Sequence, residues 1–161
     1  MDGSDACEAC GRHSVDRSLE DRAAVADVIT AYAAAIDDQR ADAVADLFTE
    51  DCVFRVFEGS KGEARGRDGV SSLVARLLST FAATSHHVSN IRVDLTGDDA
   101  ARATTYLYAW HRFLEERPDG LLWARYEDEL VRRGGRWLFT RRTLRVTGEQ
   151  DFAFRWIGPR G

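Results

Sequence analysis

Apolar residues in the first half of the chain recur at helical spacing in three segments. The first predicted helix begins after Ser18, where Ser18 to Asp21 resembles a capping box, and ends on Asp37-Asp38. A short second helix follows, with Asp42 placed to cap it. The apolar faces are predicted to carry Val25, Val28, Ile29, Tyr32, Ala33 and Ile36 in the first helix, Ala43, Val44, Leu47 and Phe48 in the second, and Val70, Leu73, Val74, Leu77, Leu78 and Phe81 in the third.

The second half of the chain shows the period-two pattern of long strands separated by turns. Before it, residues 52–57 read as a strand and residues 59–66 as a polar loop or small hairpin. The predicted strands begin at Ser85, Ala100, Leu121 and Trp137, and glycine-bearing turns at 96–99, 118–120 and 133–135 separate them. Helices followed by a strand meander predict an α+β domain, with helices packed on one face of a curved antiparallel sheet.

Length and composition favour one compact domain. The chain has 161 residues, of which 44% are hydrophobic, enough for one sizeable core. We expect a flexible tail over residues 1–17, the domain over 18–148 and a C-terminal extension over 149–161. The net charge of -5 argues against nucleic acid as a partner. Without an apolar run of roughly 20 residues or an apolar signal core, we expect no membrane association and a cytoplasmic location.

The three cysteines, Cys7, Cys10 and Cys52, do not suggest a disulfide framework because their number is odd. Cys7, Cys10 and His13 have the spacing of half a zinc site, but tetrahedral zinc needs four ligands and no second cysteine pair exists. The better interpretation is that these residues belong to the tail.

Three of the four histidines lie in the predicted sheet. If the 96–99 turn forms a hairpin, His86 or His87 returns close to His111 on the next strand. Adjacent strand residues point to opposite faces, so only one of the first two can enter a pocket. A single strand histidine is often just half-buried, but three that converge suggest a site.

Four short segments give the chain a family resemblance: Ile36-Asp37, residues 47–51, residues 86–90 and residues 133–137. Over residues 18–147 the chain resembles the SnoaL-like branch of the nuclear transport factor 2-like superfamily, and within it scytalone dehydratase, bile-acid 7α-dehydratase and the dehydrochlorinase that acts on lindane. The resemblance implies a cone-shaped α+β barrel, with three helices over a central pocket and an aspartate paired to a histidine. Asp37 and His86 match that pair, and His111 matches a second pocket histidine. The places of two substrate-polarising tyrosines of scytalone dehydratase are held here by Ile36 and Val56.

The chemistry of these residue types suits proton transfer. A carboxylate bonded to one imidazole nitrogen fixes the tautomer and raises the basicity of the other nitrogen. We therefore expect Asp37 to orient His86 as the base and His111 to act as the acid. Asp37 could instead be a solvated carboxylate at the helix end, and Asp38 is equally well placed.

Seven further residues are candidates for substrate binding, and several have a second interpretation. Asn90 could bind a substrate oxygen or satisfy a strand edge, and Tyr32 could belong to the core. Arg142 could bind an anionic group or an internal acid, and Arg141 competes with it for the inward position. The candidates are Tyr32, Phe54, Val56, Asn90, Leu107, Trp123 and Arg142, and the apolar ones suggest an apolar or aromatic substrate.

These observations predict a lyase or isomerase, most concretely a dehydratase or cyclase, that works without a cofactor on a polycyclic or polyketide-like molecule. The alternative is a non-catalytic binding or assembly module of the same fold. A third interpretation is a metal enzyme that uses His86, His111 and Asp37 as ligands. We also expect a homodimer or homotrimer through the sheet, because one strand presents an outer face of Tyr106, Tyr108, Trp110 and Arg112.

Overall fold

The structure, a computed structural model, describes residues 5–152 and 154–159, with side chains from residue 17 onward. There are three α-helices, α1 (Asp5–Asp37), α2 (Ala41–Ala45) and α3 (Gly66–Leu78), in the described residues, all in the first half of the chain, and one 3-10 turn spans Ser60–Gly62. The strands are β1 (Phe48–Arg55), β2 (Glu63–Arg65), β3 (Phe81–Gly97), β4 (Ala100–Phe113), β5 (Gly120–Arg133) and β6 (Arg136–Gln150). The α+β class predicted from the sequence is confirmed.

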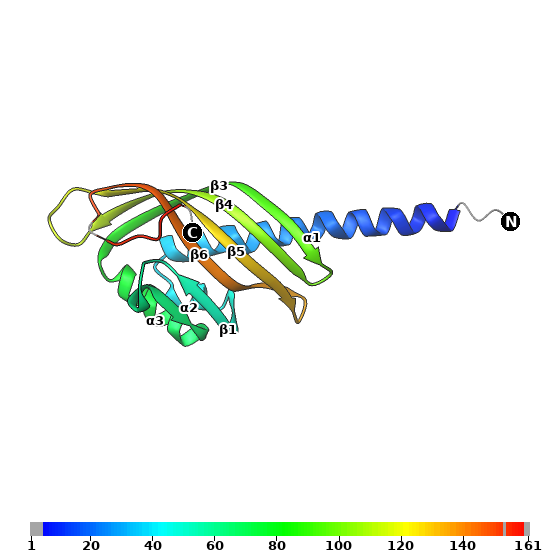
Figure 1. Ribbon diagram of the computed structural model, residues 1–161, viewed down its shortest axis with the longest axis horizontal. Helices are drawn as coiled ribbons and strands as arrows, with labels where there is room; N and C mark the ends of the chain where they lie inside the picture. Colours follow the sequence, from blue (N-terminus) through cyan, green and yellow to red (C-terminus); the bar gives the residue numbers. More distant parts are fainter. Residues whose placement is uncertain (1–4, 153, 160–161) are drawn as a thin grey trace.

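The six strands form one curved sheet in the order β2-β1-β6-β5-β4-β3. Figure 1 shows the long strands bending over α1, with α2 and α3 beside β1. The sheet does not close into a barrel, because its two edges are β2 and β3. The prediction of a purely antiparallel sheet was wrong in one place: β1 pairs with β6 in parallel. Since residues 56–135, about half of the chain, separate β1 from β6, no local pattern could reveal that pairing.

The first helix begins earlier than predicted. Helix α1 starts at Asp5, so the capping-box pattern at Ser18 lies inside a continuous helix. Its predicted apolar face is correct, with Val25 and Ile29 completely buried. Figure 1 shows the N-terminal part of α1 extending past the sheet. The side chains of Cys7, Cys10 and His13 lie outside the described residues, and the boundaries proposed for a tail and a domain remain predictions.

Helix α2 is shorter than predicted. It ends at Ala45, and Phe48 is already the first residue of β1. Asp42 does not cap the helix; its carboxylate instead accepts a hydrogen bond from the hydroxyl of Ser71 in α3 at 2.7 Å. Residues 59–66 do form a small hairpin, because β2 pairs antiparallel with β1. Phe81 follows α3 and opens β3, so it belongs to the sheet rather than to the third helix.

The long strands confirm the predicted alternation. Along β4, residues Thr105, Leu107, Ala109, His111 and Phe113 are buried, whereas the alternate side chains are half-buried or exposed. The three predicted turns join consecutive antiparallel strands. Among the described residues, no helix is both long and apolar enough to cross a membrane.

The C-terminal segment folds back onto the sheet rather than leaving it. Two carbonyl groups of the segment beyond β6 accept backbone hydrogen bonds. The N–H of Val146, in β6, donates to the carbonyl of Ile157 at 2.9 Å, and the N–H of Glu58 donates to the carbonyl of Arg155 at 3.0 Å. Phe57 and Trp156 form an isolated antiparallel bridge. These bonds hold the segment beside the open end of the sheet, where the principal cavity lies.

Candidate active site

A predominantly apolar cavity lies between the curved sheet and the helices. It encloses about 620 Å³ of empty space, including the part open to solvent at its mouth. The walls come from α1, α3, β1, β3, β4, β5, β6 and the C-terminal segment. Six of the sequence candidates line the cavity: Tyr32, Phe54, Val56, Leu107, His86 and His111.

The polar end of the cavity is built where α1 ends against β3. The Nδ1 atom of His86 lies 2.7 Å from Oδ1 of Asp37, which is a hydrogen-bond distance. The backbone N–H of His86 donates to Oδ2 of Asp37 at 2.8 Å, and the hydroxyl of Thr84 donates to Oδ1 at 2.8 Å. Because a carboxylate can only accept, Nδ1 carries the proton, and the Nε2 lone pair of His86 remains free to take one.

The carboxylate of Asp37 is ionised and held in place. Burial by itself raises its pKa, but the hydrogen bonds from the ring and backbone of His86 and from Thr84 outweigh burial and lower the pKa below the usual value. An acid at a helix C-terminus faces the negative end of the helix dipole. The three donors offset that cost, which explains how α1 tolerates Asp37 as its last residue.

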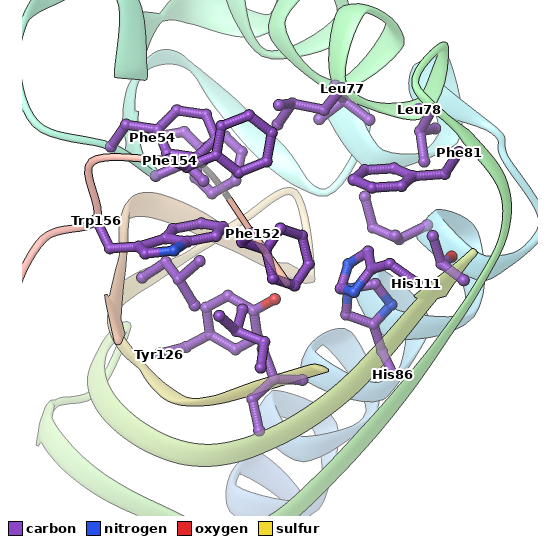
Figure 2. Close-up of a pocket in the computed structure, with 18 of the residues that line it drawn as sticks. Phe54, Leu77, Leu78, Phe81, His86, His111, Tyr126, Phe152, Phe154 and Trp156 are labelled. Atoms are coloured by element: carbon purple, nitrogen blue, oxygen red, sulfur yellow. The ribbon is translucent and has the colours of Figure 1, made fainter. Parts of the chain in front are cut away.

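His111 lies across the strand pair from His86, with ring centroids 5.3 Å apart in a T-shaped arrangement. Figure 2 shows the two imidazoles together at one end of the cavity. Burial, followed by repulsion from His86, lowers the pKa of His111 to about 3. His111 is therefore neutral at pH 7 and cannot act as a cationic acid there, contrary to the role expected from the sequence.

The lowered pKa of His111 predicts that stability falls with acidification. Below pH 6.5 the unfolded state binds a proton that the folded state does not take up until about pH 3. The free energy of unfolding should therefore fall between these values, by up to about 1.4 kcal/mol per pH unit for one group. Urea unfolding of the wild type and of His111→Phe between pH 4 and pH 7 measures this. In the variant, the free energy of unfolding should depend less steeply on pH than in the wild type. An equal dependence on pH in both proteins would contradict the prediction.

Two tyrosines of the cavity wall, Tyr32 and Tyr126, pack against a buried ion pair that lies behind them. Arg142 is completely buried, and its Nε and Nη2 atoms donate to the two carboxylate oxygens of Asp128 at 2.8 and 2.9 Å. Its guanidinium lies 4.1 Å from the ring centroids of both Tyr32 and Tyr126, which line the cavity. Burial raises the pKa of Tyr32 to about 12 and that of Tyr126 well above its usual value, so both hydroxyls keep their protons at neutral pH.

Three predicted binding residues lie elsewhere. Arg142 does not reach the cavity; the internal-acid alternative is correct, and Arg141 points outward. Trp123 is 43% exposed on the outer face of the sheet, where its ring packs 5.7 Å from that of Tyr108. Asn90 is exposed at an irregularity of β3, with a φ of 49° that interrupts the strand alternation.

Three aromatic residues that close the cavity were not predicted from the sequence. Phe152, Phe154 and Trp156 come from the C-terminal segment, and Figure 2 shows them across the cavity with Tyr126. A Cβ atom at Gly120 would lie 2.7 Å from the Phe152 ring, so glycine makes room for it. The signal in the sequence was the recurrence of an aromatic residue at every second position after β6. Tyr126, by contrast, was predictable from the inward alternation of β5.

The described side chains include no group of three or more His, Cys, Asp or Glu residues arranged to hold a metal ion. In particular, both oxygens of Asp37 and the Nδ1 atom of His86 are used for one another and for Thr84. The arrangement instead offers one free imidazole nitrogen at the end of an apolar cavity, which suits the removal of a proton from carbon.

Comparison with known proteins agrees with this architecture. A family model described as a SnoaL-like domain matches residues 17–143. A protein of Novosphingobium aromaticivorans, provisionally assigned as a scytalone dehydratase, shares 33% identity over 91% of this chain and 97% of its own, with a TM-score of 0.85. A second protein from that organism, provisionally assigned as an aromatic ring hydroxylase, shares 27% identity over 82% and 93% of the two chains, with a TM-score of 0.75.

A third solved structure shows the same fold at lower identity. The hexachlorocyclohexane dehydrochlorinase LinA-type3 of Novosphingobium barchaimii LL02 shares 22% identity over 89% of this chain and 98% of its own, with a TM-score of 0.76. No protein of curated function matches the sequence.

Proposed function

Since the chain belongs to the SnoaL-like family, we propose that it is a cofactor-independent lyase or isomerase, acting on a polycyclic or polyketide-like molecule. One observation carries the proposal: the 2.7 Å bond between Asp37 and His86 at the polar end of an apolar cavity. It orients one imidazole and leaves its second nitrogen facing the space a substrate would fill. The apolar walls suit a ring system with few polar groups.

The reaction begins with removal of a proton from a carbon next to a carbonyl group. The Nε2 atom of His86 takes the proton, and the electrons of the C–H bond form an enolate. Asp37 stabilises the imidazolium that results, without itself being protonated. In a dehydration, the enolate electrons then form the carbon–carbon double bond, the bond to the β-hydroxyl breaks, and the departing oxygen takes a proton to leave as water.

The proton for the departing oxygen comes from the imidazolium of His86. His111 is neutral at pH 7, so it holds no excess proton to donate. Its ring, 5.3 Å from that of His86, is placed to hydrogen-bond the substrate or the leaving water. The same first step serves an isomerisation or a ring closure if the enolate is protonated elsewhere or attacks another carbon.

The relatives support an elimination in particular. Scytalone dehydratase and hexachlorocyclohexane dehydrochlorinase are named for the removal of water and of hydrogen chloride from neighbouring carbons. At 22% identity, the similarity to the dehydrochlorinase shows a shared fold but does not show that this chain catalyses the same reaction. The dyad geometry therefore remains the stronger support.

A panel of cyclic β-hydroxy ketones tests the proposal. It should include 3-hydroxy-1-tetralone, which gives 1-naphthol after loss of water, and larger ring systems. We expect product formation above the buffer rate for at least one member, followed by chromatography and mass spectrometry. Saturable binding of panel members with no turnover by wild-type protein would instead favour a binding module of the same fold.

We further propose that copies of the chain associate through the outer face of the sheet. Tyr106, Tyr108 and Trp123 are 51%, 40% and 43% exposed, and they lie on adjacent strands. Such an aromatic patch is typical of an interface. Light scattering should give a dimer or trimer, and Tyr106→Asp combined with Trp123→Glu should shift it to the monomer. A wild-type monomer at high micromolar concentration would rule out this association.

A further inference from the structure

The cavity wall contains a buried hydrogen-bond donor that no described residue satisfies. Among the described side chains, eight buried nitrogen or oxygen atoms lack a hydrogen-bond partner, and two of these belong to residues that line the cavity. They are Nδ1 of His111 and Nε1 of Trp156. An unpaired buried donor destabilises the folded state, so a persistent one calls for a partner that arrives later. The indole nitrogen can only donate.

Trp156 is held firmly enough to serve as a binding group. Its backbone pairs with Phe57, and the carbonyl groups of the flanking residues Arg155 and Ile157 accept hydrogen bonds at 3.0 and 2.9 Å. Its ring packs against Phe57 and Phe154 at centroid distances of 5.0 and 5.3 Å. The donor is therefore positioned before any ligand binds.

The position of Trp156 complements that of the histidines. In Figure 2 the indole and the two imidazoles lie on opposite sides of the Phe152 ring. The Phe152 centroid is 5.4 Å from that of Trp156 and 5.1 Å from that of His111. A ligand that reaches both ends of the cavity must therefore span more than one ring.

We propose that Trp156 is a specificity-determining residue whose indole N–H binds an oxygen acceptor on the apolar ligand, at the end remote from the Asp37–His86 pair. The acceptor is a carbonyl or ether oxygen, since a hydrocarbon cannot satisfy the donor. The inference rests on the proposed function only in placing the substrate in this cavity. The C-terminal segment thus selects oxygenated ring systems, while β3 and α1 supply the base.

Binding of two matched probes tests the assignment without turnover. 1-Tetralone and tetralin share a bicyclic skeleton and differ in the ketone oxygen, and equilibrium dialysis measures the affinity of each. The wild type should prefer the ketone. Trp156→Phe keeps an aromatic ring but removes the donor, so ketone affinity should fall about 3- to 10-fold, with tetralin affinity unchanged within about 2-fold.

Trp137→Phe is the matched control, because Trp137 also has a buried indole nitrogen but does not line the cavity. It should leave the ketone preference unchanged. In protein labelled with 15N at the indole nitrogens, the signal that Trp156→Phe removes should shift with 1-tetralone and not with tetralin.

An unaltered ketone preference in Trp156→Phe, a wild type without that preference, or an unshifted indole signal would each overturn the assignment. Loss of the proposed catalysis is measured separately, because these binding experiments do not use His86. A protein that discriminates the probes through Trp156 but dehydrates no ketone would keep this inference and lose the proposed function.

Discussion

Replacement of His86 by alanine is expected to abolish turnover of any substrate that the wild type converts, with kcat falling by about 10²- to 10⁴-fold. The imidazole is the base, and no other described side chain offers an unprotonated nitrogen oriented by a carboxylate at this end of the cavity. Single-turnover kinetics with the most rapidly converted β-hydroxy ketone measures the chemical step.

Asp37→Asn is expected to leave ligand binding nearly intact while lowering the rate by a large factor. An amide in place of the carboxylate can still meet Thr84 and His86, but it no longer stabilises an imidazolium and can hold the ring in the wrong tautomer. The dissociation constant, measured in the absence of turnover, should change little, whereas the single-turnover rate should fall.

His87→Ala is the matched control for both variants. His87 is the exposed neighbour of His86 on the same strand, so its loss should leave the rate unchanged. Circular dichroism of all three variants checks that they fold alike. Equal activity of His86→Ala and the wild type would show that the chemistry, if any, lies elsewhere in the molecule.

The second large effect is expected at the buried pair of Arg142 and Asp128. Both side chains are completely inaccessible to solvent, and the guanidinium is enclosed by the rings of Tyr32, Tyr126 and Phe139. Asp128→Ala would leave an uncompensated buried charge, which costs about 3–5 kcal/mol of the free energy of unfolding. Urea unfolding followed by circular dichroism measures the loss.

A neighbouring pair on the same two strands provides the control. Arg145 donates to Glu127 at 3.0 Å, but Glu127 is 39% exposed, so Glu127→Ala should cost less than about 1 kcal/mol. The double variant Asp128→Leu with Arg142→Met removes both charges and should recover much of the stability lost by Asp128→Ala. If Asp128→Ala cost no more than Glu127→Ala, the pair would not stabilise this wall of the cavity.

The local spacing of apolar residues was sufficient to predict most of the helices and strands and their buried faces. The helical spacing of Val25, Ile29 and Tyr32 gave the buried face of α1, because a helix of any length repeats every 3.6 residues. The alternation along β4 likewise put His111 inside. The turn at 96–99 returned β4 along β3, which brought His111 into the neighbourhood of His86. These features depend on residues that are close in sequence.

The tertiary structure decided which of two neighbours entered the site. Asp37 contacts β3 and meets His86, whereas Asp38, one residue later, is 61% exposed and pairs with Arg40 at 3.0 Å. The choice depends on the rotation of α1 against β3, which the packing of the whole apolar face sets. His86 faces inward and His87 outward for the same reason: the register of β3 against β4 is fixed by the buried side of the sheet.

Two expected binding residues lie outside the cavity for different reasons. Asn90 is exposed because an irregularity interrupts β3, whereas Trp123 follows the alternation of β5 and lies on the face opposite to that of its buried neighbours Leu122 and Ala124. Phe152, Phe154 and Trp156 recur at every second residue, but this spacing does not say where the segment packs, so only its contacts with Phe57, Glu58 and β6 revealed that these rings close the cavity. The sequence by itself determined the elements, their inward faces and the residue types for proton transfer. The tertiary structure decided which of those residues share a cavity, because burial and register depend on partners far away in the chain.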